Sequence, residues 1–307
     1  MSKISMFGVS RSGKTCFLYA MAQVLGKGVR YGDNLVQVIS TRARQQTKLN
    51  NGFMQLAERR WPQNSDKTES FLFKVSMQSN GHFDEIIESL EIQDYRGGLL
   101  ERTQSLDEEE FNELMASFRG SSAIIFIVDG KTLMDALDDD NKDVSHRGQI
   151  DVKRQFMAQS QIRFVENIFM EYKLIEAEVP PILIAISKGD NFASDFEREN
   201  AKKFLKESLP SIFSIGSKVT AGISIMSLGE NLGADDNGNL TGFLSLSTDY
   251  NIHIPVIFGI YADLCYRFEK INDEEERKKI IALLAPLRRL FADRVQLFIS
   301  GKQAREV

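Results

Sequence analysis

A glycine-rich segment near the start of the chain has the residue types and spacing of a loop that holds phosphate. It reads Gly8-Val9-Ser10-Arg11-Ser12-Gly13-Lys14-Thr15, which fits the pattern G-x-x-x-x-G-K-[ST]. Glycines let such a loop wrap a phosphate chain with its N–H groups pointing inward, and the start of the next helix adds a partial positive charge. We expect Lys14 to neutralise the β- and γ-phosphates and Thr15 to ligate magnesium. The predicted phosphate contacts are Gly8, Ser10, Arg11, Ser12, Gly13, Lys14, Thr15 and Cys16.

A magnesium–nucleotide site also needs a carboxylate at the end of a neighbouring strand. Two aspartates follow apolar runs, Asp94 after residues 90–93 and Asp129 after residues 124–128. Asp94 continues into Tyr95-Arg96-Gly97, and Gly97 can offer a backbone N–H to a γ-phosphate, whereas no such feature follows Asp129. We therefore favour Asp94 as the magnesium partner and expect Asp129 to cap the segment after it.

A third polar cluster follows the apolar run 182–186 and reads Ser187-Lys188-Gly189-Asp190. A carboxylate at this place accepts hydrogen bonds from both N1–H and the exocyclic amine of guanine, whereas adenine has no such pair of donors. The stem of the lysine packs on the plane of the base. A site of this kind rejects adenine because its buried carboxylate is left unpaired. The sequence therefore predicts guanine selection by Lys188 and Asp190.

The order of these motifs resembles that of the translation-factor-like (TRAFAC) P-loop GTPases, the superclass of the Ras-like switches. Within it, the chain looks closest to bacterial, double-GTPase-like small GTPase domains. The resemblance spans about residues 3 to 230. It implies that Ser227 and Leu228 belong to the loop whose backbone N–H, here on Leu228, reads the guanine O6.

The resemblance also implies a switch threonine that ligates magnesium and senses the γ-phosphate. Thr68 occupies the expected place just before the second strand, and Thr47 and Ser65 are rivals for the role. Lys14, Thr68 and Gly97 are then the groups that act on the γ-phosphate. We expect residues 35–68 and 95–111 to become ordered around that phosphate and to be released after hydrolysis.

Three departures from the family pattern affect these expectations. Ser187 replaces the usual Asn or Thr, which weakens the support of the base-binding loop. Gly98 stands where Ras-like proteins have the glutamine that orients the attacking water, so slow hydrolysis is expected. The stretch 28–66 is longer than a minimal switch and is a candidate for binding a partner. The positive charge that assists hydrolysis can come from Arg96 or Arg11 in cis, or from an arginine of a partner in trans.

The elements between the motifs predict an α/β fold. Short apolar strands alternate with longer helical segments, as in a three-layer P-loop NTPase fold with a mostly parallel six-stranded sheet and one antiparallel edge strand. The predicted strands are 4–8, 71–77, 90–92, 123–128, 182–186 and 223–228. Residues 35–61 read as a polar, partly helical excursion. The Asp235-Asp236-Asn237-Gly238 turn indicates a small hairpin.

The domain expectations follow from the same pattern. Residues 1–250 are expected to form the P-loop GTPase-like domain, with a helical insertion at about 131–178. Residues 251–307 are expected to form a helical extension packed on that domain. Its second helix is assigned to 273–298, with Pro286 kinking or dividing it.

Composition restricts the class of protein. The chain has 307 residues, with 38 Lys and Arg against 43 Asp and Glu, and the resulting charge of −5 argues against nucleic acid as a partner. Cys16 and Cys265 cannot make a disulfide framework, and no apolar run is long enough for an integral membrane segment, so a cytoplasmic location is expected. The three histidines are too far apart in sequence to suggest a zinc site.

The leading hypothesis is a GTP-binding protein that hydrolyses GTP slowly to GDP with Mg²⁺ and works as a conformational switch with a protein effector or activating partner. One alternative is an ATP-dependent kinase or ATPase in which Asp129 is the magnesium partner and Asp190 only caps a helix. Another is a scaffold that holds nucleotide without turnover.

Overall fold

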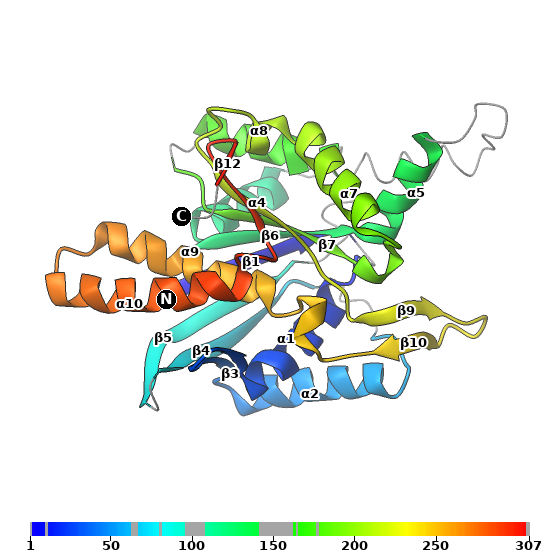
Figure 1. Ribbon diagram of the computed structural model, residues 1–307, viewed down its shortest axis with the longest axis horizontal. Helices are drawn as coiled ribbons and strands as arrows, with labels where there is room; N and C mark the ends of the chain where they lie inside the picture. The colour runs from blue at the N-terminus through cyan, green and yellow to red at the C-terminus, as the bar shows by residue number, and fades with distance from the viewer. Residues whose placement is uncertain are drawn as a thin grey trace.

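The computed structural model describes residues 2–9, 12–62, 67–79, 82–95, 108–140, 162–163, 165–175 and 178–304. Figure 1 shows one central sheet with helices on both faces. The sheet contains β1 (Ser2–Gly8), β2 (Val29–Tyr31), β3 (Asn34–Ser40), β4 (Glu69–Ser79), β5 (His82–Asp94), β6 (Ala123–Asp129), β7 (Ile182–Ser187), β8 (Thr220–Ile225), β11 (Gln296–Ile299) and β12 (Lys302–Gln303). The helices are α1 (Lys14–Lys27), α2 (Ala43–Ala57), α4 (Glu108–Arg119), α5 (Gly130–Asp140), α7 (Asp195–Ser208), α8 (Pro210–Phe213), α9 (Ile254–Lys270) and α10 (Glu274–Phe291).

The centre of the sheet is parallel. β5, β1, β6, β7 and β8 run parallel in that order, and β4 pairs antiparallel with β5. Every residue of β6 and β7 is buried because helices cover both faces, which explains their continuous apolar sequences. The predicted α/β fold with a mostly parallel sheet is confirmed. Because the strands are parallel, their carboxyl ends meet at one edge of the sheet.

Alternate residues of the central strands face two separate cores. On β6, Ile125 and Ile127 pack into the core covered by α1, α2, α9 and α10. Ile124 and Phe126 pack into the opposite core, covered by α4, α5, α7 and α8. The result is the three-layer arrangement that Figure 1 shows.

The sheet has ten strands in the described part of the chain, so the predicted number of six is too small, and the prediction of one antiparallel edge strand is wrong because antiparallel strands extend the sheet on both sides. β3 pairs antiparallel with β4, and β2 with β3. The run 35–61 thus contains β3 followed by α2. Val36 and Val38 of β3 complete the core beneath α1. A single strand is stable only when it pairs with neighbouring strands, and the sequence did not reveal that β3 pairs with β4.

The chain returns to the sheet after α10. The prediction of helix as far as residue 298 is wrong, because α10 ends at Phe291 and β11 pairs antiparallel with β8. Phe298 of β11 is buried and packs edge-on against Phe213, with 5.1 Å between the ring centroids. The added strand also covers backbone groups at the edge of β8. Pro286 lies inside α10 without dividing it.

Two smaller features complete the architecture. β9 (Gly229–Ala234) and β10 (Leu240–Leu244) form the hairpin that the turn at residues 235–238 predicts. The expected insertion at 131–178 begins with α5 and includes helical residues 165–175, whereas residues 141–161 lie outside the described part. Of the described helices, none has both the length and the apolar character needed to cross a bilayer.

Candidate functional site

The phosphate loop connects β1 to α1, and its two glycines are required for different reasons. A Cβ on Gly8 would lie 2.6 Å from the Ile127 carbonyl oxygen, because β1 and β6 approach closely there. Gly13 has open space around it but a φ of 91°, in the left-handed region that favours glycine. Ser10 and Arg11 lie outside the described residues.

The start of α1 suits an anion. Gly13 precedes the helix without a side-chain cap, and the first turn contains no acidic residue. The first N–H groups of a helix have no partner within the helix, and together they carry a partial positive charge. A phosphate group can satisfy these donors.

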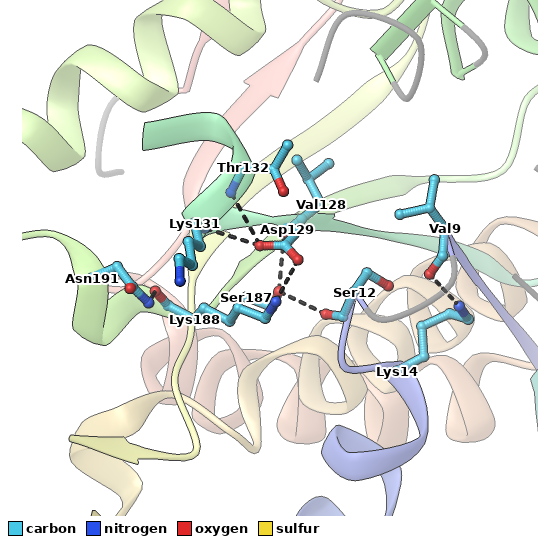
Figure 2. A network of polar contacts seen from close by, with 10 residues as sticks. All are labelled: Val9, Ser12, Lys14, Val128, Asp129, Lys131, Thr132, Ser187, Lys188 and Asn191. Atoms are coloured by element: carbon cyan, nitrogen blue, oxygen red, sulfur yellow. Dashed lines mark hydrogen bonds and ion pairs between the residues drawn. The ribbon is translucent and has the colours of Figure 1, made fainter. Parts of the chain in front are cut away.

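Lys14 is buried within the loop. Its Nζ donates to the carbonyl oxygens of Gly8 at 2.7 Å and Val9 at 2.9 Å. Figure 2 shows the ammonium group turned back toward Val9. The ammonium group of Lys14 therefore lies beside the first residues of the loop that is expected to wrap the phosphates.

Thr15 and Asp94 meet at the same edge. β1 and β5 pair with Met6 opposite Asp94, so the end of β5 lies beside the loop. Thr15 Oγ1 donates to Asp94 Oδ2 at 3.0 Å. Hydroxyl and carboxylate oxygens are ligands that magnesium prefers. The structure thus brings together Thr15 and Asp94, two of the three residues predicted to hold the metal.

The surroundings of Asp94 fit a cation. The residue is 5% exposed, and among the described residues its Oδ1 has no hydrogen-bond partner. Burial raises the pKa of this carboxyl from 3.8 to about 6, although Lys14 and the bond from Thr15 act in the opposite direction. A divalent cation would offset the cost of the buried charge. Ser12 Oγ in the loop is likewise buried without a partner in the described part.

Asp129 caps a helix and pairs with a lysine. Its Oδ1 accepts from the N–H groups of Lys131 at 3.0 Å and Thr132 at 3.2 Å, which confirms the expected cap of α5. Its Oδ2 forms an ion pair with Lys188 Nζ at 2.5 Å (Figure 2). Both oxygens are therefore engaged away from Thr15.

The base-binding loop is attached to the phosphate loop. Ser187 Oγ lies 2.7 Å from the Ser12 carbonyl oxygen, to which it donates, and 3.2 Å from that of Val128 (Figure 2). On the other side, Gly189 N donates to the Met226 carbonyl at 2.9 Å. The serine therefore still supports the loop, in spite of its departure from the usual Asn or Thr.

Asp190 is held by two donors. Ser227 Oγ lies 2.8 Å from Oδ1 and 2.6 Å from the Gly229 carbonyl oxygen, and its one proton is shared between these two acceptors. The Leu232 N–H of β9 donates to Oδ2 at 2.9 Å, a contact that the sequence analysis missed. Each carboxylate oxygen accepts more than one hydrogen bond, so capacity for a base remains. Leu228 is half-buried, and its carbonyl oxygen accepts from Ser245 N.

The candidates for the switch threonine separate in space. Thr68 immediately precedes β4, whose first residue, Glu69, pairs with Asp94, so Thr68 lies at the metal end of the sheet. Thr47 lies inside α2 and donates to the Ala43 carbonyl at 3.0 Å, away from any loop. Ser65, Arg96, Gly97 and Gly98 lie outside the described residues.

Cys16 follows the loop as the last residue of the G-K-T-C run. Burial raises the pKa of its thiol to about 12, so a thiolate is not formed near neutral pH. Its predicted contact with nucleotide then rests on its backbone N–H. Within the described residues, no three side chains from His, Cys, Asp and Glu gather as a metal site.

Comparisons with known proteins add little to this geometry. No protein-family model matches the chain, and no curated protein matches it. Among solved structures, the chain is similar to the signal recognition particle receptor SRb-GTP/SRX complex from Chaetomium thermophilum. The identity is 14%, the TM-score is 0.36, and the alignment covers 77% of this chain and 93% of that one. A likeness this weak leaves the function to be argued from the site itself.

Proposed function

We propose that the chain binds guanine nucleotide with magnesium, hydrolyses GTP slowly to GDP and acts as a conformational switch. The observation that carries this proposal is the gathering of Lys14, the Thr15–Asp94 pair and Asp190 at one edge of the sheet. This edge holds the carboxyl ends of the parallel strands, where ligands of open α/β sheets bind.

The phosphate end has a role for each residue. Lys14 and the loop N–H groups bind the phosphates, while Thr15 and Asp94 hold the magnesium ion. When bound, magnesium neutralises charge that develops on the phosphates during transfer. Asp94 holds its negative charge at neutral pH, ready for the cation, because its raised pKa of about 6 is still below 7.

The base end selects guanine. Asp190 accepts from N1–H and the exocyclic amine, and Ser227 keeps the carboxylate in place from the side. Lys188 is held by Asp129, so its stem is available to pack on the base plane. Adenine has no such pair of donors for the Asp190 carboxylate, which then keeps only its bonds from Ser227 and Leu232, and adenine is rejected for that reason.

The proposed switch is smaller than the sequence indicates. β3 belongs to the sheet, and α2 buries Leu49 and Leu56 against α1, so these elements are not free to become disordered. Residues 58–60 bond back to α2, so the segment that responds to the γ-phosphate is then the part of the chain between these residues and Thr68, together with the stretch that contains Gly97. A protein effector or activating partner reads this change in the cytoplasm.

The ATP-dependent alternative is weakened by the contacts of Asp129. It requires Asp129 as the magnesium partner, yet both of its oxygens are engaged by the start of α5 and by Lys188. It also requires Asp190 to act only as a helix cap, whereas Asp190 is bonded to Ser227 and Leu232.

The test is equilibrium binding of fluorescent GDP, GTP, ADP and ATP with magnesium. We expect guanine nucleotides to bind at least roughly a hundredfold more tightly, because adenine has no N1–H and exocyclic-amine pair to donate to the Asp190 carboxylate. Lys14→Ala should abolish binding of all four, with Lys27→Ala at the exposed end of α1 as the control. Tighter binding of adenine nucleotides would overturn the proposal.

A variant can reverse the base preference. Xanthine presents N1–H and a carbonyl where guanine has its amine, and an amide matches this pair with one acceptor and one donor. Asp190→Asn should therefore bind XDP better than GDP, whereas Asp236→Asn in the hairpin turn should not. Phosphate release under multiple turnover, with Lys14→Ala as the blank, separates slow hydrolysis from a scaffold: equal rates leave only the scaffold.

A further inference from the structure

The β9–β10 hairpin contains an irregularity close to the base-binding loop. Gly233 pairs with Thr241, and Glu230 pairs with Phe243. Between these pairs, Asn231 and Leu232 of β9 face only Gly242 of β10. This is a β-bulge, in which the extra residue is released from the ladder. Asn231 and Gly242 have φ values of 51° and 83°, which the bulge requires.

The bulge directs a backbone donor at the base site. Leu232 N–H does not pair with β10 and instead donates to Asp190 Oδ2 at 2.9 Å. Ser227 Oγ lies 2.8 Å from the other oxygen and shares its one proton between that oxygen and the Gly229 carbonyl, 2.6 Å away. Two donors on different oxygens fix the plane of the carboxylate, which one donor alone leaves free to rotate. A backbone donor is also more rigid than a side chain.

The hairpin is itself anchored to the body of the protein. Figure 1 shows it projecting beside α1 and α2. Leu240 N donates to the Arg59 carbonyl, just after α2, at 2.8 Å, and Ser245 N donates to the Leu228 carbonyl at 2.8 Å. Tyr250 Oη donates to Glu230 Oε1 at 2.6 Å. These bonds hold the bulge in place against Asp190.

We infer that the β9–β10 hairpin is a positioning element for purine selection: its bulge turns the Leu232 N–H onto Asp190 and sets the orientation in which that carboxylate meets the base. The inference rests on the proposed function and assigns part of its specificity to a segment that does not touch the phosphates. Leu232 is a positioning residue that acts through Asp190.

Two glycines of the hairpin provide a matched pair of variants. A Cβ on Gly242 would lie 2.3 Å from the Asn231 carbonyl oxygen, so Gly242→Ala must open the bulge. Gly238 has a similar φ of 79° in the turn but nothing within 4 Å, so Gly238→Ala adds comparable strain far from Asp190. Leu232→Pro is a second route, because it removes the donor without removing a bond of the ladder.

The readout is the dissociation constant of IDP divided by that of GDP, measured with magnesium on the purified full chain. Inosine lacks the exocyclic amine, so the ratio measures how well Asp190 is oriented toward that group. General loss of stability changes both affinities together and leaves the ratio unchanged. We expect Gly242→Ala and Leu232→Pro to lower the ratio roughly tenfold, the effect of one hydrogen bond to a charged group, and Gly238→Ala to leave it unchanged.

The outcomes separate this inference from the proposed function. If the wild-type chain binds GDP and IDP equally and prefers adenine nucleotides, the proposed function fails. If the wild type discriminates and both Gly242→Ala and Leu232→Pro retain its ratio, the hairpin does not position Asp190. An equal loss of the ratio in Gly238→Ala and Gly242→Ala would also overturn the inference, since it indicates general loosening of the hairpin.

Discussion

Asp94 and Asp263 are buried aspartates near opposite ends of the parallel strands, with 5% and 3% exposure: Asp94 ends β5, whereas Asp263 lies on α9 beside the first residue of β1. Asp263 on α9 accepts from Ser2 Oγ at 2.8 Å and Ser122 Oγ at 2.6 Å, and forms an ion pair with Arg267 Nε at 2.8 Å. Both of its oxygens are satisfied. Asp94 accepts from Thr15 alone, and its Oδ1 has no partner among the described residues.

The difference distinguishes a structural carboxylate from one that is suited to a ligand. A cavity of about 460 Å³ opens beside Asp263, lined in part by Ser2, Tyr266 and Arg267. The charge of Asp263 is nevertheless paired within the protein and connects β1 to α9. Asp94 differs from Asp263 in its hydrogen-bond partners, and this difference does not depend on a cavity. Its incomplete set of partners, beside a phosphate loop, is the feature that points to a cation.

The largest effect on stability is expected at Asp263, whose carboxylate is fully paired. Asp263→Asn should lower the free energy of unfolding by about 2 kcal/mol, because the ion pair with Arg267 is lost and an amide N–H₂ faces two hydroxyls and a guanidinium. Urea unfolding measures this change. Affinity for GDP should stay the same in the folded protein. A large loss of affinity there would remove the distinction between the two aspartates.

A change of opposite sign in the free energy of unfolding is expected at Asp94, whose carboxylate is incompletely paired. Asp94→Asn should stabilise the metal-free protein by about 1 kcal/mol, because burial makes the ionised carboxyl costly and the bond from Thr15 offsets only part of that cost. It should also abolish the gain in GTP affinity that magnesium provides. Thermal unfolding and titration with magnesium measure the two effects.

Asp129→Asn is the control for this variant. It should keep the magnesium effect and cost about 1 kcal/mol, because the ion pair with Lys188 is lost while Asn still caps α5. Loss of the magnesium effect in Asp129→Asn, with its retention in Asp94→Asn, would instead support the ATP-dependent alternative.

The smallest effect is a dependence on pH. The pKa of Asp94 is raised from 3.8 to about 6, so the folded protein binds more protons than the unfolded chain between these values. Stability of the metal-free protein should therefore decline as pH rises from about 4 to about 6, and this component should vanish in Asp94→Asn. Magnesium affinity should change in the other direction, increasing as the carboxyl ionises.

Calorimetric titration with magnesium between pH 5 and pH 7.5 tests the pH prediction. An affinity that does not vary over this range would show that Asp94 does not hold the metal. The same series on Asp263→Asn serves as the control, because that residue lies near the opposite end of the parallel strands.

The parts of the site that depend on neighbouring residues could be read from the sequence. Gly13, Lys14 and Thr15 lie within one turn of chain, so their spacing is enough to indicate a phosphate loop. The cap that Asp129 makes with Lys131 and Thr132 is equally local. The central parallel strands were also predictable, since burial on both faces leaves a continuous apolar run.

Contacts between distant residues were not predictable. The sequence does not indicate that Lys188 pairs with Asp129, 59 residues away, or that Leu232 holds Asp190. The strand β11 was expected as helix because its four residues read as a continuation of α10. In each case, a partner far along the chain decides the outcome, and local propensity is only a weak guide.

The amino-acid sequence alone determined that this protein has an α/β fold with a phosphate loop after its first strand, because both depend on short-range spacing and on runs of apolar residues. The residues that follow the two strand-ending aspartates already favoured Asp94 as the partner of the metal, but only the tertiary structure showed that Thr15 bonds to Asp94 and that Lys188 pairs with Asp129. The reason is physical: these contacts join residues far apart in the sequence, and the order of strands in the sheet decides which of them become neighbours.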